Sequence, residues 1–358
     1  MKFTKAAVTV SALALSLAAC SRPQPQATPD PGVKPAPPTA AVAPAAVQPS
    51  SNPAAQAIDR ATWSSQAPPE QLSDVLIRVQ ALLQRAHFSP GEIDGKDGGN
   101  LKTAVAAFEQ AHNLPVDGLL DDQVWTQLSR NAGPVMTDYV IAAEDVQGPF
   151  VAEIPKEMAD QAKLDHLAYK SPLEGLAEKF HMSPELLQAL NPGADFARAG
   201  STIVVVAPGA ADLPAKVARV EVDKSRLQAR AYGADGALLA VYPATVGSED
   251  RPAPSGTWEV RAVAPEPTYT YDPSRLTFGK KSAGKLTIKA GPNNPVGATW
   301  IDLTKETYGI HGTPDPSLVG KVASHGCVRL TNWDVAQLGR AVEKGAKVVF
   351  VGSEGAGA

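Results

Sequence analysis

Two short segments near the C-terminal end of the chain carry side chains suited to acyl transfer. One is His311-Gly312-Thr313, and the other runs from Ser324 through His325, Gly326 and Cys327 to Leu330. A cysteine attacks a carbonyl carbon as its thiolate, so it needs an imidazole nearby to take the proton or hold the ion pair. Gly312 and Gly326 let the backbone approach a substrate closely, and the amides of Gly326 and Cys327 can stabilise an oxyanion. These residue types predict a cysteine nucleophile.

Cys327 has three alternative roles. It can be a buried apolar cysteine, although the Ser, His and Arg around it are poor neighbours for a core. It can bind zinc together with His311 and His325, although a fourth ligand at suitable spacing is missing. It can form a disulfide with Cys20, the only other cysteine, although that residue lies near the opposite end of the chain.

The segments around the motif have the period of β-strands. Apolar and polar side chains alternate from Val217 onward, and the turn 233–236 joins two such runs as a hairpin. We expect further strands at 256–263, 286–290, 298–303 and 347–351. One helix should follow the capping box Thr331–Asp334, with its positive end directed at the cysteine, which would favour the thiolate. Residues 215–352 are therefore expected to form a mostly β domain with one packed helix.

This region resembles the catalytic domain of the L,D-transpeptidases, the YkuD family. The resemblance runs from about Lys216 to Val351, and its landmarks besides 324–329 are 246–247 with 254–258, 294–297 and 309–313. It implies a β-sandwich or barrel with one packed helix.

The same resemblance implies a role for each site residue. Cys327 would be the nucleophile and His311 the general base, with the Gly312 carbonyl orienting the imidazole. The remaining catalytic residues would handle the oxyanion or hold a substrate carboxylate or the active-site loop, and they are His325, Gly326 and Arg329. Four more residues are expected to line the substrate site: Ser324, Thr313, Asn294 and Gly297.

The implied reaction has two acyl-transfer steps on peptidoglycan stem peptides. Cys327 would attack the carbonyl of the third residue, normally meso-diaminopimelate, expel D-Ala and pass the acyl group to an amine, which gives a 3-to-3 cross-link. No metal or organic cofactor is needed. The same thioester can instead serve hydrolysis, D-amino-acid exchange, or attachment or release of an outer-membrane lipoprotein. A wall-binding scaffold without activity and a secreted cysteine protease are the alternatives from other classes.

The N-terminal end is typical of an exported lipoprotein. Residues 1–20 contain two lysines, an apolar run too short to span a bilayer and the ending Leu17-Ala18-Ala19-Cys20, which resembles a lipobox. The resemblance implies that Cys20 is acylated and that the protein lies in the periplasm, anchored to the inner leaflet of the outer membrane. An ordinary cleaved signal is the alternative. Residues 21–70 hold 12 of the 32 prolines, which predicts an extended linker without a core of its own.

Two small modules are expected between the linker and the catalytic domain. Residues 71–131 contain three amphipathic helical segments with turns at 93–95 and 116–118, and they resemble a peptidoglycan-binding domain. Residues 160–208 follow the order strand, two helices, strand, with Ser183 and Pro184 starting the second helix. They resemble LysM, a glycan-binding fold. A plain helical bundle and a packing spacer are the respective alternatives.

Composition agrees with a multidomain α+β protein. The 358 residues suffice for two or three domains, and 32 prolines with 29 glycines argue against an all-α fold. A formal charge of -4, without a basic stretch, argues against a nucleic-acid partner.

Overall fold

Residues 47–65, 69–247, 252–274, 284–322, 324 and 326–353 are described here in a computed structural model of the chain. All lie within one compact unit, Pro44–Ala358, whereas the other unit is Met1–Ala43. The expected signal peptide, Cys20 and linker residues 21–46 therefore lie outside the described residues.

Three helices form the first module, as their periodicity predicts. They are α2 (Pro69–Arg85), α3 (Gly99–Ala111) and α4 (Asp122–Leu128). Apolar side chains spaced three or four residues apart on each helix face inward. The buried ones include Val79, Leu83, Val105, Phe108 and Val124.

The linker prediction is wrong over residues 53–60, which form helix α1 (Pro53–Arg60). Ala55 and Ile58 are buried against the first module. Asp59 Oδ1 accepts hydrogen bonds from the backbone amides of Val135 (2.6 Å) and Met136 (3.1 Å). Two apolar side chains and one carboxylate are enough to dock this helix onto a neighbouring core, although the segment has no core of its own.

The second module pairs two strands, β1 (Met136–Val140) and β2 (Thr202–Val206), in antiparallel register. Helices α7 (Pro172–Lys179) and α8 (Pro184–Leu190) lie between them in sequence, and Ser183 caps α8 as predicted. The first strand thus lies before the expected boundary at residue 160. The intervening insertion holds two short helices, α5 (Ala143–Val146) and α6 (Met158–Gln161). The helices of both modules share one hydrophobic core.

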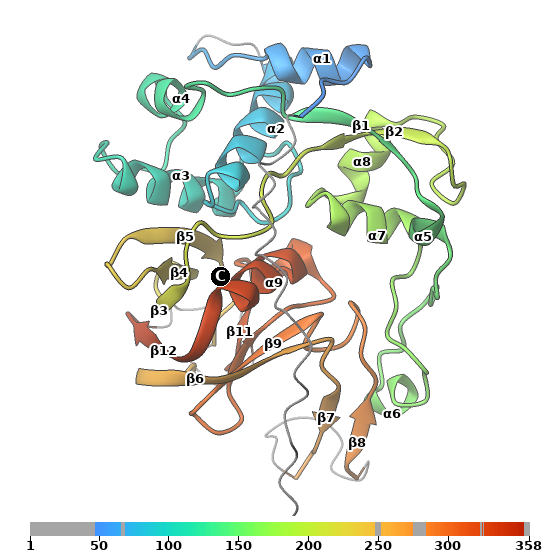
Figure 1. Cartoon of the computed structure of the whole chain (residues 1–358), viewed down its shortest axis with the longest axis vertical. Coiled ribbons are helices and arrows are strands. Elements are labelled where there is room, and N and C mark those ends of the chain that lie inside the picture. The colour runs from blue at the N-terminus through green and yellow to red at the C-terminus, as the bar shows by residue number, and fades with distance from the viewer. Residues whose placement is uncertain are drawn as a thin grey trace, which may run out of the picture. The chain divides into compact units, whose positions relative to one another are not determined.

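An eight-stranded curled sheet dominates the C-terminal domain (Figure 1). The strand order is β11-β10-β9-β6-β12-β3-β4-β5. These strands are β3 (Val217–Asp223), β4 (Gln228–Tyr232), β5 (Leu238–Pro243), β6 (Gly256–Pro265), β9 (Thr299–Leu303), β10 (Gly309–His311), β11 (Val328–Arg329) and β12 (Val342–Val351). Helix α9 (Asn332–Ala341) packs on β9, β10 and β12. The separate strands β7 (Tyr269–Tyr271) and β8 (Leu286–Ile288) pair with each other.

The first module closes one edge of this sheet. The segment after α2 runs parallel to β5: the Ser89 amide donates to the Val241 carbonyl (2.8 Å), and the Val241 amide donates to the His87 carbonyl (2.8 Å). Ser89 also donates its hydroxyl to Asp334 Oδ2 of α9 at 2.9 Å. Backbone groups of the edge strand are thereby paired instead of left open.

Candidate active site

Two neighbouring strands, β10 and β11, carry His311 and Arg329, and β11 lies next to Cys327 in sequence. β10 and β11 are parallel, with Ile310 opposite Val328 and His311 opposite Arg329. Because residues directly opposite each other on adjacent strands point to the same face, His311 and Arg329 face the same side of the sheet. Cys327 immediately precedes β11, at the level of Gly309.

His311 has the surroundings of a neutral base. Its ring is buried and stacks on Trp300, with ring centroids 5.4 Å apart. Nδ1 lies 2.7 Å from the Gly312 carbonyl oxygen. Since a carbonyl only accepts, Nδ1 carries the proton and Nε2 is left with a free lone pair. Burial, together with the positive charge of Arg329, lowers the pKa of His311 to about 3.

Cys327 is a half-buried free cysteine whose Sγ lies 3.9 Å from the Thr307 carbonyl oxygen. Burial raises the pKa of its thiol, and the Gly309 amide and the Arg329 charge only partly offset that effect. This differs from the expectation that the dipole of α9 favours a resting thiolate. A neutral thiol has to lose its proton during the attack, and an unprotonated imidazole is a suitable acceptor for that proton.

The turn before Cys327 is held by Ser324. Its hydroxyl donates to the Cys327 carbonyl (2.6 Å) and accepts from the Gly326 amide (3.0 Å). Gly326 has φ +117°, a conformation that favours glycine. Because the Gly326 amide is engaged by Ser324, it is not free to bind an oxyanion in this arrangement. The expected contribution of that amide therefore requires the turn to rearrange.

Arg329 supplies the positive charge of the site. Burial lowers its pKa, while the nearby Cys327, Asp315 and Tyr269 act in the opposite direction. Its backbone exchanges two hydrogen bonds of 2.9 Å with Thr245. Tyr269 on β7 and Trp300 on β9 were not predicted as site residues, because nothing in their local sequence signals a contact with the motif.

The other predicted site residues have different surroundings in the structure. Thr313 is buried, and its hydroxyl accepts from the Asp315 amide at 3.2 Å. Asn294 is fully buried, and its side chain bonds to the Lys289 carbonyl (2.6 Å) and the Val296 amide (2.9 Å). These contacts shape the loop around Asn294 and leave its side chain no exposed surface for a substrate. His325 lies outside the described residues.

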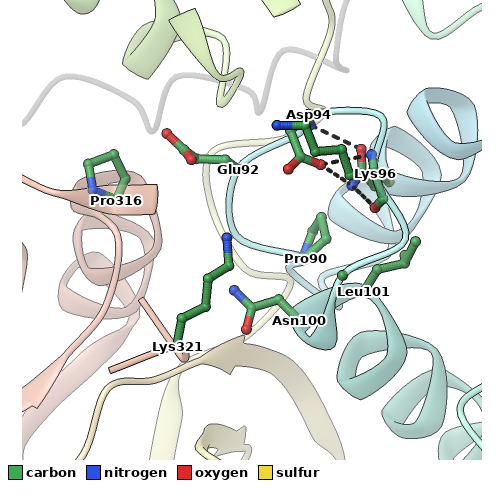
Figure 2. Close-up of a pocket in the computed structure, with 10 residues that line it drawn as sticks. Pro90, Glu92, Asp94, Lys96, Asn100, Leu101, Pro316 and Lys321 are labelled. Atoms are coloured by element: carbon green, nitrogen blue, oxygen red, sulfur yellow. Dashed lines mark hydrogen bonds between the residues drawn. The ribbon is translucent and has the colours of Figure 1, made fainter. Parts of the chain in front are cut away.

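The loop between the two halves of the motif rests on the first module. Asn100 Nδ2 donates to the Val319 carbonyl at 2.9 Å. Thr245 accepts from the Gly320 amide at 2.9 Å on the other side of the loop. Figure 2 shows Asn100 beside Lys321 in the polar cleft between the two domains, with Glu92 and Pro316 at its margin.

Comparison with known families agrees with these observations. Residues 218–350 match the L,D-transpeptidase catalytic domain, YkuD. The C-terminal domain is therefore similar to L,D-transpeptidase catalytic domains over this range. Residues 73–128 match a peptidoglycan binding domain, which agrees with the resemblance of the first module. The LysM resemblance of the second module stays a prediction.

Two relatives and one solved structure illustrate how far the similarity extends. A Bacillus licheniformis protein named as an L,D-transpeptidase, YkuD, is 29% identical over 176 residues, which cover 49% of this chain and 91% of that protein. The Escherichia coli protein named as the L,D-transpeptidase YbiS is 29% identical, over 50% of this chain and 60% of its own length. An L,D-transpeptidase structure from Mycobacterium smegmatis is 20% identical with a TM-score of 0.31, covering 42% of this chain and 65% of that one.

The described residues offer no metal site, since they contain no group of three or more His, Cys, Asp or Glu side chains suitably placed. The zinc alternative also involves His325, which is outside them. Within the same part of the chain, no helix has the length and apolar character needed to cross a membrane.

Proposed function

We propose that this protein is a cell-wall L,D-transpeptidase in which Cys327 is the nucleophile and His311 the general base. The observation that carries the proposal is the hydrogen bond from His311 Nδ1 to the Gly312 carbonyl. This bond fixes the tautomer of His311 whose Nε2 can accept a proton. His311 lies on β10, which pairs with β11, the strand that begins directly after Cys327. The lowered pKa of His311 keeps this nitrogen unprotonated near neutral pH.

The first step forms a thioester. The Cys327 thiol gives its proton to His311 Nε2 as sulfur attacks the carbonyl of the third stem-peptide residue, meso-diaminopimelate. The C–N bond to the terminal D-Ala breaks, and His311 returns the proton to the departing amine.

The second step forms the cross-link. The side-chain amine of another stem attacks the thioester carbonyl, His311 accepts its proton, and the thiol is restored. The bond that is broken supplies the free energy, so a 3-to-3 cross-link forms without ATP. Water, a D-amino acid or a lipoprotein amine would give the alternative products from the same intermediate.

Arg329 is suited to binding a substrate carboxylate or holding the loop. It is a partly buried cation close to Cys327, and a guanidinium presents a planar fork of donors to a carboxylate. The resemblance also assigns the oxyanion to His325 and the Cys327 amide, and these assignments stay predictions.

Wall binding belongs to the N-terminal modules in this proposal. The first module matches a peptidoglycan binding domain. The second has a pocket between its insertion and α7, lined by the aromatic rings of Phe150 and Tyr169 and the charged groups of Asp145 and Lys179. Aromatic faces next to polar groups suit a sugar ring, which supports the predicted glycan binding.

The proposed location of the protein follows from its proposed substrate and from its N-terminal sequence. Peptidoglycan lies outside the cytoplasm, and the ending Leu17-Ala18-Ala19-Cys20 resembles a lipobox. We therefore propose a periplasmic protein held by lipid on Cys20 at the outer membrane. Mass spectrometry of the mature N-terminal peptide would show either the acylated cysteine or an unmodified cleavage product.

Incubation with disaccharide-tetrapeptide muropeptides tests the function. The expected product is a 3-to-3 linked dimer together with free D-Ala. Tripeptide with D-Ala alone would indicate hydrolysis, and exchanged tetrapeptide would indicate D-amino-acid exchange. Unchanged muropeptides and unchanged sacculi would refute the assignment.

A further inference from the structure

A carboxylate of the second module reaches into the catalytic domain. Glu178 on α7 is only 8% exposed. Asn332, the first residue of α9, donates its Nδ2 to both Glu178 oxygens, at 3.0 and 3.2 Å. The Tyr169 hydroxyl donates to the same carboxylate at 3.3 Å. A polar contact between modules, 154 residues apart in sequence, is thus fully enclosed by protein.

Asn332 in turn packs against the peptide next to the catalytic histidine. Its Oδ1 accepts from the Ala298 amide at 3.0 Å. A Cβ added to Gly297 or Gly312 would overlap this oxygen, so both positions have room only for glycine. Gly297 has φ +63° and lies against the peptide that joins Gly312 to Thr313. The amide of Asn332 therefore defines one wall of the space occupied by this peptide.

The orientation of that amide depends on Glu178. An asparagine side chain can turn over and exchange its oxygen with its NH2 group. The Glu178 oxygens facing Nδ2 favour one orientation of the Asn332 amide. In the reversed orientation Oδ1 would face the Glu178 oxygens and the NH2 group would face the Ala298 amide, so that acceptor would oppose acceptor and donor would oppose donor. The Pro292 carbonyl, 3.2 Å from Nδ2, favours the same orientation. Glu178 thus helps to keep Oδ1 on the Ala298 and Gly312 side.

We propose that Glu178 is a positioning residue for His311, acting through Asn332 on the Gly312 carbonyl that fixes the imidazole tautomer. The catalytic role of His311 comes from the proposed function, on which this inference rests. The consequence is that the second module, whatever it binds, completes the scaffold of the active site in the neighbouring domain.

The role of Glu178 as a hydrogen-bond acceptor predicts which substitution will be tolerated. Burial raises its pKa to about 8, with the Asn332 hydrogen bond opposing and the nearby Glu174 carboxylate reinforcing that shift. Glutamine keeps one carbonyl oxygen at this position, so it can still accept a hydrogen bond from Asn332 Nδ2 whether or not the carboxyl group of Glu178 is protonated. Methionine has a similar size and no acceptor comparable to a carbonyl oxygen.

The test uses the full chain labelled with 15N-histidine. Long-range 1H–15N spectra report whether each imidazole carries its proton on Nδ1 or Nε2, and a His311→Gln variant assigns the signal of His311. The wild-type protein and Glu178→Gln should show the Nδ1–H form. Glu178→Met should show a mixture with the Nε2–H form. Asn332→Ala breaks the same link from the other end, gives the same result and serves if the Met variant does not fold.

Kinetics on tetrapeptide muropeptides complete the test. Misplacement of a base lowers the chemical step more than binding, so Glu178→Met should reduce kcat by about 10-fold to 100-fold with KM within about 2-fold. The Glu178→Gln variant should keep at least about half of the wild-type kcat, because its amide still offers an acceptor.

Glu109→Gln is the matched control. Glu109 is a buried carboxylate of the first module that accepts from the Asp117 and Gly118 amides, at 3.0 and 2.9 Å. The Glu109→Gln substitution should lower the free energy of unfolding without changing the 15N spectrum of His311. A folded Glu178→Met or Asn332→Ala variant with the wild-type Nδ1–H signal would overturn the proposal. If the wild-type protein forms no cross-links, the proposed function fails, and the spectra alone still decide on the role of Glu178.

Discussion

Asp334→Asn should make the protein less sensitive to alkaline pH. Asp334 is buried at the junction of α9 with the first module, where Ser89 donates to its Oδ2. Burial raises its pKa from 3.8 to about 7. The folded state therefore holds the proton more tightly than the unfolded chain does. The stabilising contribution of this group is complete below pH 3.8 and is lost as the pH rises through about 7.

The size of this loss follows from the two pKa values. Each pH unit between them costs about 1.4 kcal/mol, so the contribution of Asp334 to the free energy of unfolding falls by roughly 2 to 3 kcal/mol from pH 5 to pH 8. Asparagine does not titrate and keeps an acceptor for Ser89. The difference in unfolding free energy between Asp334→Asn and wild type should move by that amount in favour of the variant.

Urea unfolding followed by tryptophan fluorescence at pH 5 and pH 8 measures this difference. The neighbouring Trp333 on α9 reports on the same junction. The exposed Asp235→Asn serves as control and should show no such trend. A difference between Asp334→Asn and wild type that is independent of pH, or that moves in favour of the wild type at pH 8, would refute the assigned burial and protonation of Asp334.

Gly297→Ala should destabilise the fold by about 1 to 3 kcal/mol, because its positive φ and its contact with the 312–313 peptide leave no space for a Cβ. Melting temperature measures this, and an unchanged value would contradict the close packing; the open Gly133→Ala is the control. Asn100→Ala removes the hydrogen bond to the loop at Val319, worth about 1 kcal/mol. Hydrogen exchange of residues 316–322 should rise, and unaltered exchange would show that the first module does not hold the loop. His311→Gln should slow acylation of Cys327 by carbapenem by about 10² to 10⁴, and a rate near that of the wild type would remove its role as base.

Much of the C-terminal fold follows from local patterns. Apolar patterning predicts β3 to β6, β9 and β12, and the predicted strand at 286–290 contains β8. The capping signal predicts α9, for which Thr331 is the N-cap. β10 and β11 were missed because strands of three and two residues are too short to show a period. Helix α1 was missed because its stability comes from docking onto other elements, which composition does not reveal.

The candidate site likewise contains residues that the local sequence predicts and residues whose role depends on tertiary packing. Residue type and spacing predict a cysteine nucleophile at Cys327 with a histidine as its base, whereas the choice of His311 as that base rests on the family resemblance. Glu178 and Asn332 look like an ordinary surface glutamate and a helix-start asparagine in their local sequence. Their contact exists only because the second module docks on the catalytic domain, and no short-range pattern encodes such docking. The hydrogen bond from the Gly326 amide to Ser324 likewise depends on the conformation of the turn and could not be predicted from residue type.

The acyl-enzyme is the most direct test of the central claim. Brief incubation of the protein with tetrapeptide muropeptide, acid quenching and peptide mass spectrometry would locate any covalent adduct. The account predicts the mass of the muropeptide without its terminal D-Ala, joined as a thioester to Cys327 and absent from Cys327→Ala. Cross-linked product formed by Cys327→Ala, or an adduct on any other residue, would contradict it.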